Sequence, residues 1–143
     1  MKILSLDLGD KWVGSAISDE LCLTCRPFQT VELKNTADFL KKTIQEQNIQ
    51  KIIIGYPKTS KGTKSEQTLK IEKQKNELEE KFKKMEFDNL EWILWDERLS
   101  SKRAENINTK KIKTSEDKKK SHSIAAAFIL QSYIDYLAFS KSL

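Results

Sequence analysis

Acidic residues at the ends of two apolar segments are the groups in this sequence best suited to chemistry. Asp7 follows the apolar run that begins at Lys2, and the pair Asp96-Glu97 follows LEWILW. A carboxylate half-buried at the end of an apolar strand is costly without a partner, and clustered carboxylates commonly meet that cost by binding a divalent cation. The spacing alone does not bring the two segments together. Each acid could instead begin a turn or cap a helix, as Asp96 could before Arg98.

The single histidine is a second candidate. His122 lies in KKKSHSIAAAFILQ, between a lysine-rich segment and an apolar helix. At helical spacing it shares a face with Ala126, Ile129 and Tyr133, so we expect its ring on the core side, where a histidine more often packs than binds a ligand. A neutral imidazole there can also hold a metal, because the first turn of a helix disfavours the imidazolium ion. The residues alone leave both interpretations open.

The elements that must position these residues follow from the hydrophobic pattern. Three strand-like segments joined by short turns, KILSLDLG, WVGSAISD and FQTVEL, indicate an antiparallel meander. Helices over 35–47 and 65–85 then alternate with apolar strands at KIIIGYP and LEWILW. A third helix is expected to start in DERLSSKRAENI, and a last one to cover 121–139. This order predicts an α/β fold, with a mixed sheet of about five strands and helices on both faces.

The totals indicate one domain over residues 1–143, and its basic charge favours, without establishing, a polyanionic partner. The net charge is +5 and the pI is about 9.1, which favours phosphate-rich partners. Neither the N-terminal run nor the stretch 124–139 has the length and apolarity of a signal peptide or a bilayer span, so we expect a cytoplasmic protein without membrane contact. Cys22 and Cys25 form a C-x-x-C without a second pair and are expected to be ordinary reduced thiols.

Basic residues near these candidates could contact nucleic acid. A lysine-rich loop over 109–120 is expected to be mobile, and it is either a solvated segment or a flap that grips phosphates through Lys118, Lys119 and Lys120. Lys11 could contact a backbone phosphate. Arg98 could clamp a scissile phosphate bidentately or pair with an acid.

Glycines and tryptophans around Asp7 have two interpretations each. Gly9 and Gly14 let the backbone bend tightly, and they could admit a phosphate. Trp12 could stack on a base or pack into the core. We expect the two remaining tryptophans, Trp92 and Trp95, to pack against the sheet.

Four motifs, in order, resemble the YqgF/RuvX family of the RNase H-like nuclease superfamily. DLGDKWVGSAISD resembles the opening aspartate-glycine pattern, and IIIGYPKTSKGTKSEQT resembles the Gly-x-Pro loop. WDERLSS resembles the Asp-Glu-Arg-Leu motif, and SIAAAFILQSYIDY resembles the closing helix. The resemblance covers nearly the whole chain, and the expected element order agrees with the RNase H-like fold.

The resemblance implies a divalent-metal-dependent nuclease of bacterial type, and therefore a phosphodiester hydrolase. Family members are described as acting on the 5′ end of pre-16S rRNA, a step of ribosome biogenesis, and earlier as Holliday junction resolvases. The catalytic, metal-binding acids carry over to Asp7 and Glu97, and the third acid falls on His122 without a gap. Mg²⁺ prefers oxygen ligands, so an imidazole ligand would favour Mn²⁺ over Mg²⁺ as the cofactor.

Two other functions stay open. A resolvase acting on branched DNA would need a symmetric dimer to cut two strands. A non-catalytic nucleic-acid-binding protein would have lost the third acid. Precursor ribosomal RNA is the favoured partner, on the resemblance, and the sequence does not decide between a monomer and a homodimer.

Overall fold

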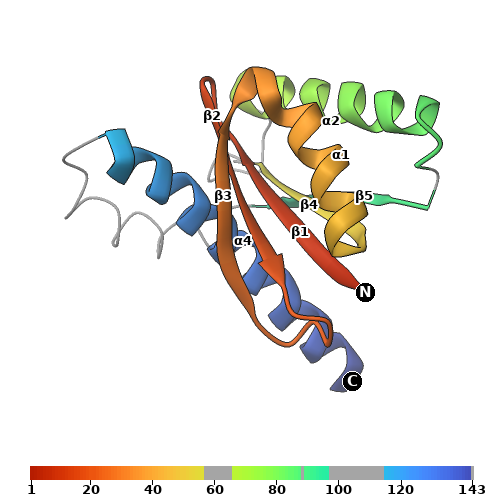
Figure 1. Ribbon diagram of the computed structural model, residues 1–143. Helices are drawn as coiled ribbons and strands as arrows, with labels where there is room; N and C mark the ends of the chain where they lie inside the picture. The colour runs from red at the N-terminus through yellow and green to blue at the C-terminus, as the bar shows by residue number, and fades with distance from the viewer. Residues whose placement is uncertain (57–65, 88, 97–114, 143) are drawn as a thin grey trace.

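A five-stranded mixed sheet forms the centre of the protein (Figure 1). The computed structural model describes residues 1–56, 66–87, 89–96 and 115–142, without the side chains of 115–118 and 142. The elements, in chain order, are β1 (Lys2–Leu8), β2 (Trp12–Ser18), β3 (Cys25–Glu32), η1 (Leu33–Asn35), α1 (Thr36–Gln47), β4 (Ile49–Tyr56), α2 (Glu66–Lys84), β5 (Glu91–Asp96) and α4 (Ser115–Ser142).

The strand order is β3-β2-β1-β4-β5. β1 pairs antiparallel with β2, and β2 with β3, which makes the predicted meander. β4 pairs parallel with both β1 and β5. The predicted α/β architecture is therefore confirmed, and β1, which carries Asp7, lies in the middle of the sheet. The helix expected to start in DERLSSKRAENI lies outside the described residues.

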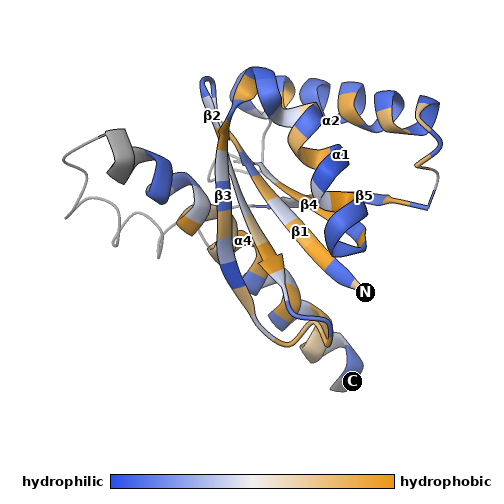
Figure 2. Ribbon diagram, viewed as in Figure 1, coloured by the Kyte–Doolittle hydropathy of each residue, from blue (hydrophilic) through white to orange (hydrophobic). Residues whose placement is uncertain are grey.

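Helices cover both faces of the sheet, as predicted. α1 and α2 pack on one face over a core that includes Leu4, Leu6 and Ile52. α4 covers the other face, where Ala126, Leu130 and further residues of the helix contact Ile3, Ala16 and Ile53. β1 and β4 are predominantly apolar and α2 is mainly hydrophilic (Figure 2), because these inner strands are buried on both sides while α2 buries only a narrow stripe.

Helix α4 begins earlier than the sequence pattern indicates. Residues 115–120 are its first turns, so the prediction of a mobile loop over 109–120 is wrong for this half of the segment, and 109–114 lie outside the described residues. The hydroxyl of Thr30 donates a 2.6 Å hydrogen bond to the carbonyl of Lys119. This contact with β3 anchors a lysine-rich turn that has no hydrophobic period of its own.

The length of α4 also changes the membrane assessment. By length and composition alone, Lys119–Lys141 could cross a membrane, contrary to the expectation that this region is too short and too polar. In this structure it is a core helix, because Ala126, Ile129, Leu130 and Tyr133 lie buried against the sheet. Core helices of proteins that do not cross a membrane pass the same test of length and composition.

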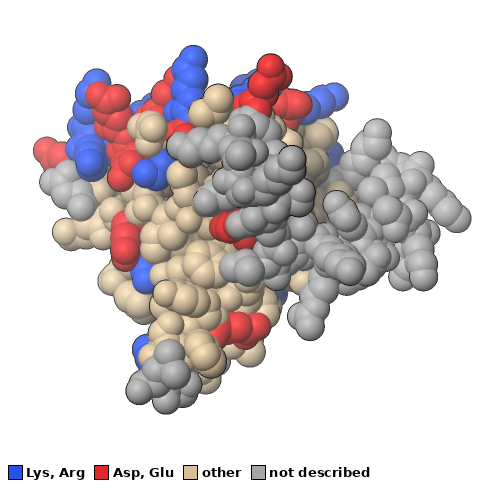
Figure 3. Space-filling view, turned by 180° about the vertical axis from the view of Figure 1, so that it is seen from behind, with Lys and Arg blue, Asp and Glu red and all other residues tan. Residues whose placement is uncertain are grey.

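Charged side chains are unevenly distributed over the surface. In the view from behind, acidic and basic residues gather at the top, over α2, and the lower part over α4 is mainly uncharged (Figure 3). The basic character of the chain is therefore not spread evenly over the described surface.

Candidate active site at the end of the first strand

Asp7 and His122 lie in direct contact although 115 residues separate them. The Nδ1 atom of His122 is 3.0 Å from Oδ2 of Asp7. The side chain of Asp7 is 20% exposed and that of His122 is 29% exposed, so the pair is shielded but still reaches solvent. Two of the predicted site residues thus meet at one place, on the face of the sheet that α4 covers. Their roles in metal binding and catalysis stay predictions.

Gly14 makes this meeting possible. It pairs with Asp7 in the register of β1 and β2. A Cβ atom at Gly14 would lie 2.2 Å from both the carbonyl carbon and oxygen of His122, far inside any real contact. The backbone of α4 therefore passes directly over Gly14 and places the histidine beside Asp7. Gly14 thus leaves room for the backbone of α4, whereas the sequence suggested that it could admit a phosphate.

The tight turn of the hairpin completes the arrangement. Gly9 donates a 2.9 Å backbone hydrogen bond to the carbonyl of Trp12 and lies below the ring of His122, whose Cε1 would be 3.2 Å from a Cβ there. On the far side of the pair, the hydroxyl of Ser5 donates to the carbonyl of Ala126 at 2.6 Å. Together with the Thr30–Lys119 bond, these contacts hold α4 on the sheet above and below His122.

The pair is a chemically suitable start of a metal site. One carboxylate and one imidazole are donors that Mn²⁺ and later first-row ions accept. Neighbouring ligands of an octahedral ion with bonds of about 2.1 Å lie about 3 Å apart. The 3.0 Å between Asp7 and His122 matches that spacing, and it equally suits a direct hydrogen bond. The residues therefore fit a divalent ion, with further ligands still needed.

The helix dipole does not act on His122 as expected. The sequence pattern placed the residue in the first turn, but α4 starts at Ser115, which puts His122 two turns inside. The dipole effect falls off within the first turn, so it gives no reason for a neutral ring. The predicted core-side orientation is confirmed, because Ala126, Ile129 and Tyr133 are buried on the same face.

The second acidic segment lies two strands away. Asp96 ends β5 and pairs with Tyr56 of β4, so β4 separates it from β1 by two strand spacings of about 4.8 Å each. Glu97 and Arg98 lie outside the described residues. Within the ranges that the structure describes, no three His, Cys, Asp or Glu residues form a group that could hold a metal ion.

Two of the predicted nucleic-acid-binding lysines converge on Trp12. The Nζ atom of Lys119 lies 4.7 Å from the centre of its ring, and Nζ of Lys11 lies 5.7 Å away. Lys120 is exposed in the next position of α4. For Lys118 the structure gives the helical backbone only. The basic residues therefore lie on the same hairpin and helix end as Asp7 and His122. The sequence did not signal the Trp12–Lys119 contact, because it joins segments far apart in the chain.

Asp10, at the tip of the same hairpin, serves another purpose. Its carboxylate accepts a 2.6 Å bond from Lys70 of α2, and this hydrogen bond and the lysine charge lower the pKa of Asp10. The contact ties the hairpin tip to α2. The carboxylate is almost fully exposed and is paired with Lys70, so we do not assign it to the site.

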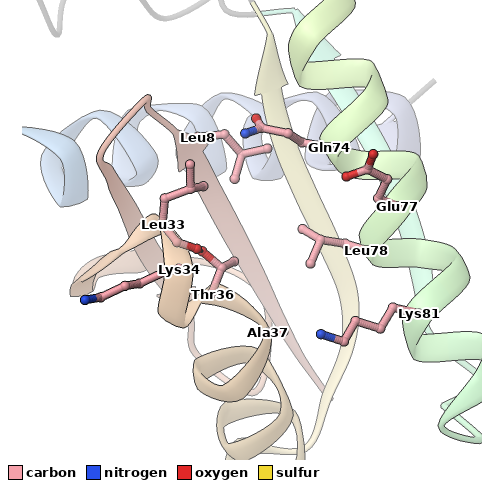
Figure 4. Close-up of a pocket in the computed structure, with 9 residues that line it drawn as sticks. All are labelled: Leu8, Leu33, Lys34, Thr36, Ala37, Gln74, Glu77, Leu78 and Lys81. Carbon is pink, nitrogen blue, oxygen red and sulfur yellow. The ribbon is translucent and has the colours of Figure 1, made fainter.

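A partly apolar cavity lies on the opposite face of the sheet. It has a volume of about 380 Å³, and the residues that line it include Leu8 of β1, Leu33, Ala37 and Leu78, with Gln74 and Lys81 at its edge (Figure 4). Side chains alternate along a strand, so Leu8 and Asp7 face opposite sides of the sheet. The cavity lies between α1 and α2 and has no access to the carboxylate of Asp7.

Comparison with known proteins identifies the family. The sequence profile of the RuvX family, described as Holliday junction resolvase, matches residues 1–136. The chain belongs to this family. It is 38% identical to a protein of Caldicellulosiruptor bescii over 95% of this chain and 97% of the relative, and 36% identical to one of Agathobacter rectalis over 99% and 100%. Both bear the name "Putative pre-16S rRNA nuclease".

Solved structures support the RNase H-like fold expected for a RuvX protein. Thermus thermophilus RuvC in complex with a Holliday junction substrate aligns with a TM-score of 0.63 at 9% identity, over 97% of this chain and 96% of that one. Fowlpox virus resolvase, with its Holliday junction DNA, aligns with a TM-score of 0.56 at 16% identity, over 96% and 99%. At such identities the likeness shows the fold, and the resemblance to the family stated from the motifs is confirmed.

Proposed function

We propose that this RuvX protein is a divalent-metal-dependent nuclease that processes the 5′ end of pre-16S rRNA in the cytoplasm. The observation that carries the proposal is the contact between Asp7 and His122 at the end of the central strand, in a chain whose relatives are named for this activity. Its reaction is hydrolysis of a phosphodiester bond. Asp7, Glu97 and His122 would be the metal ligands and catalytic residues.

Glu97 is included because the family resemblance carries the second catalytic acid over to it. It follows Asp96, the last residue of β5, and β5 lies two strands from β1. Glu97 lies outside the described residues, so its place beside the Asp7–His122 pair is part of the proposal.

Bound ions would supply an activated water and stabilise the leaving oxygen in such a site. The protein's own residues would hold the ions and orient the metal ligands. Asp7 offers one oxygen beside His122, and the contacts of α4 with Gly14 and Ser5 fix the imidazole. Lys11, Arg98 and Lys118 to Lys120 would neutralise substrate phosphates, because they belong to the hairpin, the segment after β5 and the start of α4.

Cleavage of a 5′-labelled pre-16S rRNA fragment tests the proposal directly. We expect cleavage with Mn²⁺, a lower rate with Mg²⁺, and loss of cleavage in Asp7→Asn and Glu97→Gln. Asp38→Asn removes the same charge from an exposed position on α1 and is the matched control, with an unchanged rate. Cleavage that survives Asp7→Asn would contradict the proposed site, and rates with Mg²⁺ equal to or above those with Mn²⁺ would contradict His122 as a ligand.

A readout without substrate separates metal binding from cleavage. His122 is the only histidine of the chain, so its ring protons can be followed without ambiguity in a proton NMR spectrum. Paramagnetic Mn²⁺ bound between Asp7 and His122 would broaden these signals at a small fraction of one equivalent. Asp7→Asn should remove the broadening, whereas Asp38→Asn should keep it. Broadening that is equal in both variants would place the ion elsewhere.

Holliday junction cleavage is the second candidate function, favoured by the family description and by the fold of the two resolvases. A resolvase cuts two strands and would need two copies of the site. Paired cuts in a four-way DNA junction, together with a dimer in sedimentation on that junction, would support this function. A strict monomer that cuts only the rRNA fragment would exclude it. Tight binding without cleavage under any metal would indicate a non-catalytic binding protein.

A further inference from the structure

Trp12 lacks the packing partners that the other two tryptophans have. The ring of Trp92 contacts Phe82, and that of Trp95 contacts Tyr133 and Tyr136. Trp12 belongs to neither hydrophobic core cluster, and no aromatic ring of the described residues lies against it. It is partly exposed at the start of β2. Core packing therefore does not explain this large side chain.

The neighbours of the ring are positive charges. The Nζ atom of Lys119, from α4, lies 4.7 Å from the ring centre, and that of Lys11, from the hairpin, lies 5.7 Å from it. Lys11 forms no ion pair with any residue in the described ranges. Two ammonium groups over one aromatic ring combine an apolar surface with nearby positive charge. A nucleotide has the complementary pattern, with a flat base between charged phosphates.

The position of the ring relates it to the candidate active site. The carbonyl of Trp12 closes the hairpin on Gly9, and two residues farther along β2 lies Gly14, which pairs with Asp7. Lys119 is three residues before His122 in α4, one helical turn away. A nucleotide stacked on Trp12 would therefore lie close to the Asp7–His122 pair.

We propose that Trp12 is a stacking platform for one unpaired nucleobase of a single-stranded substrate, with Lys11 and Lys119 binding the phosphates on either side of it. This inference rests on the proposed function and narrows its substrate class. A base in a duplex is stacked on both faces and cannot lie on the ring, so the platform selects single-stranded segments next to the cleaved bond.

The energies favour exchange of the lysine for a base. A cation–π contact at an exposed ring stabilises by about 0.5–1 kcal/mol, whereas stacking of a base on an aromatic side chain stabilises by about 1–3 kcal/mol. A lysine that moves from the ring to a phosphate would gain a charged partner, so one stacked base would replace one of the two cation–π contacts.

The test compares two oligomers of equal charge. One is a ten-residue single-stranded oligouridine, and the other is an abasic ribose-phosphate chain of the same length. Binding is measured by fluorescence anisotropy of labelled oligomers in EDTA, so that no cleavage occurs. For the wild-type protein we expect tighter binding of oligouridine. Trp12→Leu should weaken that binding about 5- to 150-fold, the equivalent of losing one stacked base at about 1–3 kcal/mol.

Two further measurements distinguish stacking from a structural role. The abasic oligomer should bind equally to wild type and Trp12→Leu, and Trp12→Phe should restore most of the oligouridine affinity. Equal loss for both oligomers would overturn the proposal in favour of a strap between the hairpin and α4, and so would an unchanged affinity for oligouridine. A wild-type protein that cleaves the rRNA fragment but fails this test would refute the platform alone. A protein that neither binds nor cleaves RNA would refute the proposed function as well.

Discussion

Substitution of Gly14 by alanine tests how the candidate site is assembled. The added Cβ would lie 2.2 Å from the carbonyl carbon and oxygen of His122 and 2.6 Å from the nitrogen of Ser123. These are backbone atoms of a helix, so no side chain can turn away. Ordinary contact begins at 3.4 Å, and α4 would have to retreat from β2 by about 1 Å.

The size of the effect follows from that displacement. Overpacking of this kind lowers the free energy of unfolding by about 1–3 kcal/mol. A retreat of about 1 Å would stretch the 3.0 Å bond between His122 and Asp7 beyond hydrogen-bonding distance. A catalytic group misplaced by about 1 Å can lower a rate by about 10²-fold. We therefore expect Gly14→Ala to remain folded and to cleave the rRNA fragment about 100-fold more slowly.

A variant of similar stability separates the site from the fold. Ile17→Val removes one methylene from a side chain that is 1% exposed on the same strand, on the face away from α4, and should lower the free energy of unfolding by about 0.5–1.5 kcal/mol. Urea titrations give both stabilities, and cleavage is measured where both variants are more than nine-tenths folded. If Gly14→Ala matches Ile17→Val in rate and keeps the Mn²⁺ broadening of His122, the reasoning about helix placement is wrong.

Three further predictions concern the site and its surroundings. His122→Asp should gain Mg²⁺-dependent cleavage, and Mg²⁺ should raise its unfolding midpoint in urea more than that of the wild type, since ligand at 100 times Kd stabilises by about 2.7 kcal/mol. Replacing Lys118, Lys119 and Lys120 by glutamine should flatten the log–log salt dependence of RNA binding by up to about 3 units, with little change in sequence preference; an unchanged slope would exclude these lysines from phosphate contact. Burial, with the charges of Asp135 and Asp19, raises the pKa of the Cys25 thiol from 9.0 to about 11. At pH 8 native Cys25 should therefore have about 100-fold less thiolate than the unfolded chain, and it should react correspondingly slowly with iodoacetamide, as measured by peptide mass. The raised pKa also predicts stability that is present below pH 9 and is lost as the pH rises toward 11, and Cys25→Ala should remove that loss.

The sheet was predictable because its signals are local. Apolar runs such as KIIIGYP are typical of buried parallel strands, and short turns between the first strands favour a meander. The start of α4 was not predictable in this way. Residues 115–120 carry no hydrophobic period, and the Thr30–Lys119 bond that anchors them joins segments 89 residues apart. The polarity of this segment therefore predicted the exposure of Lys120 correctly, but it predicted the conformation of residues 115–120 wrongly.

The candidate site, too, was predictable from the sequence only in part. Asp7 and His122 were selected by residue type and by the family resemblance, and their contact across 115 residues could not be read from spacing. The contact depends on the absence of a side chain at Gly14, which has no local signature beyond the glycine itself. Trp12 was recognisable as an aromatic residue near Asp7 with Lys11 beside it in the chain, but the approach of Lys119 follows only from the packing of α4.

An imidazole in place of a carboxylate changes the resting state of this site. Two carboxylates 3.0 Å apart repel each other unless a cation lies between them, whereas Asp7 and His122 can share a hydrogen bond without one. The hairpin and α4 can thus pack in the absence of metal. An ion that binds the pair must first displace this bond, which is worth about 1.5–3 kcal/mol for a charged partner, or about 10- to 150-fold in affinity. In the proposed site the Asp7–His122 bond would therefore lower the affinity for the ion, and this is why His122→Asp is expected to make both stability and cleavage depend more strongly on Mg²⁺.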